Sequence, residues 1–101
     1  NLGIALNFEG IQATEVYELH QNTPNPFSDE TVIGFTLPKA TKGTLMVSDV
    51  KGAVVYKVEG NYAKGNNQVT LKKSQLGASG VLYYTLETAD FTATKKMIIL
   101  E

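Results

Sequence analysis

Hydrophobic residues recur at every second position through most of the chain, with polar or small residues between them. In the segment TVIGFTLP, Ile33, Phe35 and Leu37 alternate in this way, and Pro38 ends the run because proline lacks a backbone N–H. A period of two places alternate side chains on one face of a β-strand. The same pattern predicts strands over residues 2–8, 16–20, 31–37, 44–50, 53–60, 68–73, 81–88 and 91–100.

Turn signals separate the predicted strands. Asp49 and Gly52 bound a tight turn in DVKG, because aspartate accepts nearby backbone N–H groups and glycine adopts positive φ. Residues 60–67, rich in Gly, Asn and Lys, are expected to form a loop, and Leu76 is expected to anchor one turn in the core. No window has the 3.6-residue period of a helix. The predicted fold class is all-β, an antiparallel, immunoglobulin-like β-sandwich of seven to eight strands.

The chain of 101 residues is long enough for one domain with a modest core. It begins with Asn1 and not with methionine, so we expect it to be part of a longer protein. Residues 1–8 are expected to be the last strand of a preceding domain or an edge strand. Residues 9–18 are expected to be a linker, and residues 19–101 the C-terminal domain.

Charge and composition exclude several classes of function. All nine basic residues are lysines and the net charge is −1. Arginine is the preferred residue for contacts to phosphate and guanine, so the composition argues against nucleic-acid binding. The absence of cysteine excludes disulfides and cysteine nucleophiles. No apolar run approaches the roughly 20 residues that span a bilayer, so we expect no transmembrane segment.

No group of residues forms a catalytic or metal-binding motif. His20 is the single histidine and is expected to be a solvated side chain at a strand end. Asp29 and Glu30 are adjacent acids without the spacing of a calcium loop. The serines lack the G-x-S-x-G context of a hydrolase. We therefore expect no enzyme activity, no metal site and no cofactor.

Residues 19–27, LHQNTPNPF, form the most specific polar stretch. Pro24 and Pro26 fix φ near −65° and keep the residues before them out of the helical region. Asn25 can bond nearby backbone groups, as asparagine does in turns. Phe27 is expected to insert as an anchor, and its burial would contribute about 1.5–3 kcal/mol. The stretch predicts a stiff bend that sets the register of the strand after it.

Four motifs follow one another along residues 19–101. They are carried by Leu19, Gln21, Asn22, Pro24, Asn25, Pro26 and Phe27 with Thr31, Ile33, Phe35, Leu37 and Pro38; by Leu45, Val47, Asp49, Gly52 and Val55; by Leu76, Gly80, Tyr84 and Leu86; and by Lys95, Lys96 and Met97. In this order and spacing they resemble the type A C-terminal sorting domain of the type IX secretion system of gram-negative bacteria. One departure is Leu82, where the family usually has tyrosine, so a hydroxyl role at that position is not carried over.

The resemblance implies a domain appended to the C-terminus of an exported cargo protein. The outer-membrane translocon of the type IX system would recognise it as a secretion and sorting signal. In many such systems a sortase-like peptidase at the cell surface then cuts the domain off. The implied partners are the translocon, the peptidase and an N-terminal cargo domain in the same chain. The implied localisation is the periplasm in transit, then the cell surface or the medium.

The last predicted strand, residues 91–100, is the expected recognition element, because an exposed sheet edge can accept a partner strand. Its adjacent lysines point to opposite faces, and lysines at an edge also protect against aggregation. Cleavage is expected within residues 9–18, and Gly80 is expected to set the turn before the penultimate strand. The residues expected to serve recognition and sorting are Pro24, Asn25, Pro26, Phe27, Gly80, Lys95, Lys96 and Met97.

An alternative function is a carbohydrate-binding accessory module of a secreted hydrolase. Tyr56, Tyr62, Tyr83 and Tyr84 are the aromatic residues that could form a platform for a sugar ring. Tyr83 and Tyr84 point to opposite faces of one predicted strand, so we expect one of them to be exposed.

Overall fold

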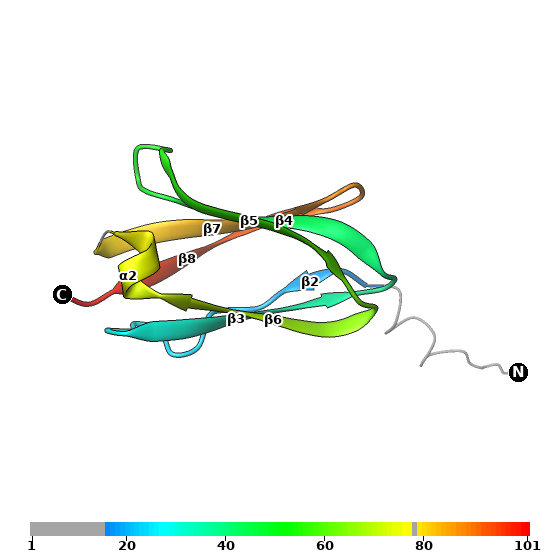
Figure 1. Ribbon diagram of the computed structural model, residues 1–101, viewed down its shortest axis with the longest axis horizontal. Coiled ribbons are helices and arrows are strands. Elements are labelled where there is room, and N and C mark those ends of the chain that lie inside the picture. Colours follow the sequence, from blue (N-terminus) through cyan, green and yellow to red (C-terminus); the bar gives the residue numbers. More distant parts are fainter. Residues whose placement is uncertain (1–15, 78) are drawn as a thin grey trace, which may run out of the picture.

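Two antiparallel sheets lie face to face in the computed structural model, which describes residues 16–77 and 79–101 (Figure 1). The three-stranded sheet has the order β2 (Glu18–Leu19), β3 (Glu30–Leu37) and β6 (Gly65–Lys72). The four-stranded sheet has the order β5 (Val54–Tyr62), β4 (Thr41–Ser48), β7 (Gly80–Thr88) and β8 (Thr92–Ile99), and the short helix α2 (Lys73–Leu76) connects β6 to β7. The predicted all-β antiparallel sandwich is confirmed, with seven strands in the described residues.

Strand β3 contributes a continuous row of side chains to the core. Its alternate residues Thr31, Ile33, Phe35 and Leu37 are all buried, as the period of two predicts. The strand pairs with β6 over its whole length, from Glu30 opposite Lys72 to Leu37 opposite Gly65.

The four-stranded sheet supplies the opposite wall of the core. Leu45 of β4 lies opposite Leu86 of β7, and Val47 lies opposite Tyr84. All four side chains are fully buried, whereas Tyr83 on the other face is 38% exposed. Because successive side chains of a strand point to opposite faces, one residue of shift in register would exchange the core face for the solvent face.

Two predicted local features are present. Asp49 Oδ1 accepts the backbone N–H groups of Lys51 and Ala53, each at 2.9 Å, and Gly52 has a φ of 90°. Leu76 of α2 is buried in the core at 2% exposure. In the described part of the chain, no helix is long and apolar enough to cross a membrane.

The prediction of a loop over residues 60–67 is wrong in extent, because the loop in the structure is shorter. Strand β5 continues to Tyr62, and β6 begins at Gly65, which lies opposite Leu37. Gly and Asn are poor strand formers, but pairing with a full-length neighbour overrides that preference. Tyr62 also packs edge-on against Phe35, with ring centroids 5.0 Å apart, which holds the end of β5 over the core. The strand predicted over residues 2–8 lies outside the described residues.

Candidate functional site

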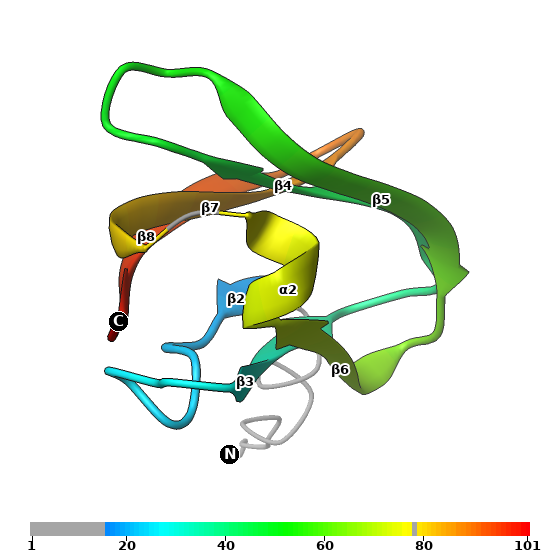
Figure 2. The same ribbon diagram turned by 60° about the vertical axis from the view of Figure 1, so that its left-hand side comes forward.

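Two groups of residues singled out from the sequence lie side by side in the fold. The first is Gln21–Phe27, which we call the proline segment, and the second is the terminal strand β8. Figure 2 shows the proline segment, in light blue, running from β2 of one sheet towards the C-terminal end of β8 in the other sheet. The segment therefore closes one side of the sandwich.

Backbone hydrogen bonds join the end of the proline segment to β8. The Phe27 N–H donates to the Ile98 carbonyl at 3.1 Å, and the Leu100 N–H donates to the Phe27 carbonyl at 2.8 Å. The Ile98 N–H donates to the side-chain Oδ1 of Asn25 at 2.9 Å. Asn25 and Phe27 thus satisfy backbone groups that the edge of a sheet would otherwise present to solvent.

Gln21 makes a further connection at the start of the segment. Its Nε2 donates to the Lys96 carbonyl at 2.7 Å and to the Asn22 Oδ1 at 2.7 Å. Thr23 exchanges two backbone hydrogen bonds of 2.9 Å with Val32 of β3. One short stretch is therefore bonded to both sheets.

A buried polar cluster lies beneath the proline segment. Asn22 is 2% exposed, and its Nδ2 donates to the Pro24 carbonyl at 3.2 Å and to the Thr31 Oγ1 at 3.1 Å. Thr31, itself fully buried, donates to the same Pro24 carbonyl at 2.8 Å. Buried polar groups are costly unless they are hydrogen-bonded, so this cluster specifies one conformation of the bend.

Tyr84 completes the cluster from the opposite sheet. Its hydroxyl donates to the His20 carbonyl at 2.7 Å and accepts the Asn22 N–H at 2.9 Å. Burial, which disfavours the phenolate, raises the pKa of Tyr84 above its usual value, while the hydrogen bond from Asn22 acts in the opposite direction. The tyrosine therefore stays neutral and connects the two sheets through the core.

The eight residues expected to serve recognition divide into buried and accessible groups. Phe27 is 2% exposed and Met97 is fully buried, so both present no surface to a partner while the domain is folded. Lys95 is half-buried and Lys96 is exposed, on opposite faces of β8. The accessible residues of this set are Pro24, Asn25, Pro26, Gly80, Lys95 and Lys96. Gly80 begins β7 with a φ of 91°, which suits glycine.

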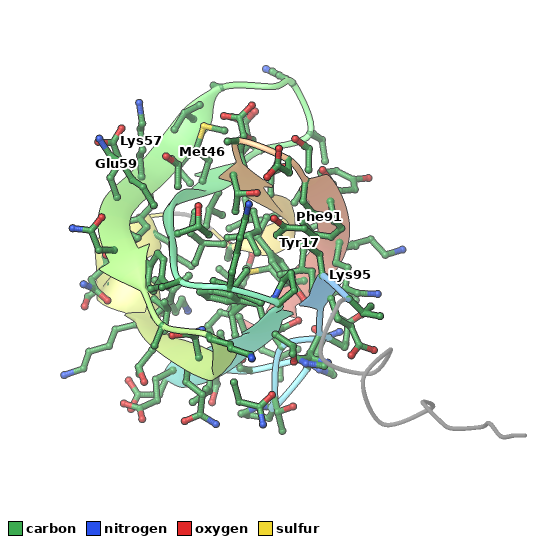
Figure 3. The ribbon with its side chains drawn as sticks, turned by 90° about the vertical axis from the view of Figure 1, so that its right-hand side faces the viewer. Tyr17, Met46, Lys57, Glu59, Phe91 and Lys95 are labelled. Atoms are coloured by element: carbon green, nitrogen blue, oxygen red, sulfur yellow. The ribbon has the colours of Figure 1, made fainter. Side chains whose placement is uncertain are left out.

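A cluster of side chains holds the beginning of the described chain against the β7–β8 turn. The rings of Tyr17 and Phe91 are stacked, with centroids 5.0 Å apart and planes 8° from parallel. The Tyr17 hydroxyl donates to Asp90 Oδ2 at 3.4 Å, and the Lys39 Nζ lies 3.3 Å from the same oxygen. Figure 3 shows Tyr17 and Phe91 together beside β2 and β8, with Lys95 close by. Residues 17 and 18 of the predicted linker are thus packed on the domain.

The four tyrosines of the alternative function do not share a surface. Tyr84 is fully buried, and Tyr83 lies on the outer face of the four-stranded sheet. Tyr56 and Tyr62 are partly buried and pack against the core. A sugar platform needs two or more exposed rings side by side, which this arrangement does not supply.

The remaining polar candidates are structural or solvated. The Nε2 of His20 lies 3.0 Å from Thr36 Oγ1, and its ring is partly buried. Asp29 and Glu30 are exposed near the start of β3. Within residues 16–77 and 79–101, no three His, Asp or Glu side chains come together as metal ligands.

Sequence reasoning missed the contribution of Thr31 and of the Tyr84 hydroxyl. The sequence indicates Thr31 only as a motif residue, and Tyr84 as a motif residue and a candidate ring of a sugar platform. The available signal is that Thr31 is in phase with Ile33, Phe35 and Leu37, because a hydroxyl on the buried face of a strand requires a partner. The partner lies across the sandwich, which a one-dimensional pattern does not reveal.

Comparison with known families gives a match over most of the chain. The family model described as "Secretion system C-terminal sorting domain" matches residues 23–100 of the 101 residues. The match begins in the proline segment and ends just beyond β8, so it spans the two elements that the hydrogen bonds join. A comparison with curated proteins found no matching relative.

Proposed function

The chain belongs to the family of secretion system C-terminal sorting domains, and on this premise we propose how it works as a sorting signal of type IX secretion. The family consists of sorting signals and not of enzymes. The domain would pass through the periplasm behind its N-terminal cargo, be recognised by the outer-membrane translocon, and bring the cargo to the cell surface or the medium.

The observation that supports this proposal best is the closure of the domain by its own motif residues. A sorting signal must adopt the same structure behind many different cargoes. The buried hydrophobic residues of the described chain form one core cluster that runs from Leu19 to Ile99. Asn25 and Phe27 bind β8 directly, and the motif thereby builds a self-contained unit.

Recognition would fall on the accessible residues around the terminal strand. Lys95 and Lys96 supply positive charge there, and Pro24 and Pro26 supply a rigid exposed bend. Phe27 and Met97 would act indirectly, because their burial holds the bend and the strand in place.

A sortase-like peptidase would cut upstream of the folded domain. Proteases bind an extended and accessible backbone, and Tyr17 and Glu18 are already engaged in a ring stack and in β2. We therefore narrow the predicted cleavage window from residues 9–18 to the residues of that window that precede Tyr17. Sequencing the N-terminus of the released domain tests this position, and a cut between Ile33 and Leu100 would refute it.

A fusion experiment tests the function itself. The whole chain is attached to the C-terminus of a periplasmic fluorescent protein in a bacterium that has the type IX system. We expect fluorescence at the cell surface or in the medium, and retention in the periplasm for a control chain that lacks residues 92–101. Retention of the fusion with the intact chain would contradict the proposal. A glycan array that binds the purified domain would favour the carbohydrate-binding alternative.

A further inference from the structure

The outer edge of β8 is divided into two halves. In an antiparallel strand the N–H and C=O of one residue point to one neighbour, and those of the next residue point to the other. Ile98 directs both groups away from β7, towards Asn25 and Phe27. Thr92, Thr94 and Lys96 have the same parity, so their backbone groups also point outwards.

The C-terminal half of this edge is occupied. The Lys96 carbonyl, both backbone groups of Ile98 and the Leu100 N–H are all bonded to the proline segment. A partner strand could reach these groups only by displacing Phe27 from the core, where it is 2% exposed. We call this part the covered half.

The N-terminal half of the edge has no hydrogen-bonding partner among the described residues. It comprises the N–H and C=O groups of Thr92 and Thr94 and the N–H of Lys96, and we call it the open half. Among the described residues, no hydrogen bond is formed by these groups. Three consecutive outward-facing residues are enough to begin a short antiparallel or parallel pairing with an added strand.

The side chains around the open half define the chemistry of an added strand. Lys95 lies opposite the buried Tyr84 and so belongs to the inner face. Figure 3 shows it close to the stacked rings of Tyr17 and Phe91. On the outer face lies Lys96, and neither lysine forms an ion pair within the described residues. At the other end, the carboxylate of Asp90 is already paired with Lys39. Within residues 16–77 and 79–101, the charge left without an ionic partner at this edge is therefore positive, and it lies beside an aromatic surface.

The edge of β5 is a useful contrast. Leu45 of β4 lies opposite Val58, and by the same alternation Lys57, Glu59 and Asn61 direct their backbone groups away from β4. The Lys57 Nζ lies 3.6 Å from the Glu59 carboxylate, so the charges on this edge compensate each other. Figure 3 shows both residues on β5, away from Tyr17 and Phe91.

We propose that the open half of β8, from Thr92 to Lys96, receives an extended strand of the export machinery by β-strand addition. The added strand carries an acidic side chain opposite Lys95 or Lys96 and an apolar side chain against Tyr17 and Phe91. This inference rests on the proposed sorting function and deepens it. Because Tyr17 is stacked on Phe91, the chain also enters the domain beside the docking edge. One partner can therefore contact both the entering chain and the edge of β8.

Proline at position 94 tests the backbone role. Thr94→Pro removes an outward N–H and leaves the ladder to β7, whose donors lie on the odd-numbered residues of β8. In the fluorescent fusion we expect about tenfold less export, the effect of losing roughly 1.4 kcal/mol of docking free energy. Thr94→Ala removes the same side chain, so the difference between the two variants isolates the backbone donor.

Glu59→Pro is the matched control on the edge of β5, where we expect export at the wild-type level. If the wild-type fusion stays in the periplasm, the sorting function is wrong and this inference falls with it. If the wild-type fusion is exported and a folded Thr94→Pro fusion is exported equally well, the docking edge is wrong and the sorting function stands.

A crosslinking measurement decides the case in which Thr94→Pro does not fold. A photoreactive residue is placed at Thr94 in one fusion and at Glu59 in another, both in the otherwise wild-type chain. We expect a crosslink from position 94 to an outer-membrane component of the secretion system, mapped by mass spectrometry to an extended segment that contains an acidic residue. Crosslinks to that component from position 59 only would overturn the proposal.

Discussion

Replacing Tyr84 with phenylalanine removes one oxygen atom from the centre of the domain. The ring remains in place, so the apolar packing of Tyr84 in the core is unchanged. The His20 carbonyl loses the hydroxyl that donates to it at 2.7 Å, and the Asn22 N–H loses its acceptor at 2.9 Å. Asn22 is 2% exposed, so water cannot easily replace that acceptor.

The size of the effect follows from these two hydrogen bonds. Each contributes about 0.5–1.5 kcal/mol net, and loss of both gives about 1–3 kcal/mol of destabilisation. For a domain of this size, a loss of 2 kcal/mol lowers the melting temperature by roughly 8–16 °C. Tyr83→Phe is the matched control: its hydroxyl makes no hydrogen bond in the described part of the chain, and we expect a change within about 0.5 kcal/mol.

Urea unfolding followed by far-ultraviolet circular dichroism measures both variants, since the chain has no tryptophan to report by fluorescence. We expect Tyr84→Phe to lower the midpoint with an unchanged dependence on urea concentration. If Tyr84→Phe is no less stable than Tyr83→Phe, the connection between the two sheets through this hydroxyl is not a source of stability, and the reasoning about the buried cluster is wrong.

Three further predictions test the same region. Burial holds the pKa of Tyr84 above its ordinary value of 10.0, so the unfolded chain releases that proton at a lower pH than the folded chain does. The stability of the domain should therefore be intact below pH 10 and fall as the pH rises above it. Urea unfolding at pH 8 and pH 11 should show a smaller loss of stability in Tyr84→Phe than in the wild type. Asn25→Ala should lower the free energy of unfolding by about 0.5–1.5 kcal/mol through the lost bond to the Ile98 N–H, and a value no larger than that of the exposed Asn61→Ala would speak against this contact. In hydrogen exchange monitored by nuclear magnetic resonance, the amides of Ile98 and Leu100 should be protected and that of Thr94 should exchange rapidly; equal protection of all three would mean that the edge of β8 is not divided as described.

The alternation of hydrophobic residues predicts the existence of the described strands, though not all of their ends. Ile33, Phe35 and Leu37 are buried as their spacing required, and Asp49 forms the predicted turn with Gly52. Phe27, predicted as an anchor from its place after two prolines, is buried in the core. These features depend on neighbours close in the sequence or on a single repeated period, which a sequence displays directly.

Features that depend on distant pairing could not be predicted. The hydrogen bonds from the Ile98 N–H to Asn25 and from the Asn22 N–H to Tyr84 join residues more than sixty positions apart. Gly65 and Asn66 belong to a strand only because β3 lies beside them, and their own propensities favour a loop. The sequence indicates that the proline motif is specific. That the motif binds β8 can be seen only when the position of β8 in the fold is known. The role of the motif in recognition remains a prediction for the export experiments.

Because the proline segment binds β8, the domain can complete its fold only when both ends of the sequence are present. Asn25 and Ile98 are separated by 73 positions, so the sandwich cannot close until nearly the whole of this stretch has been synthesised. A product that stops before residue 96 would leave the Phe27 backbone without its partners and one side of the core uncovered. Such a fragment would be open to proteolysis, so only chains that include β8 would present a folded sorting domain.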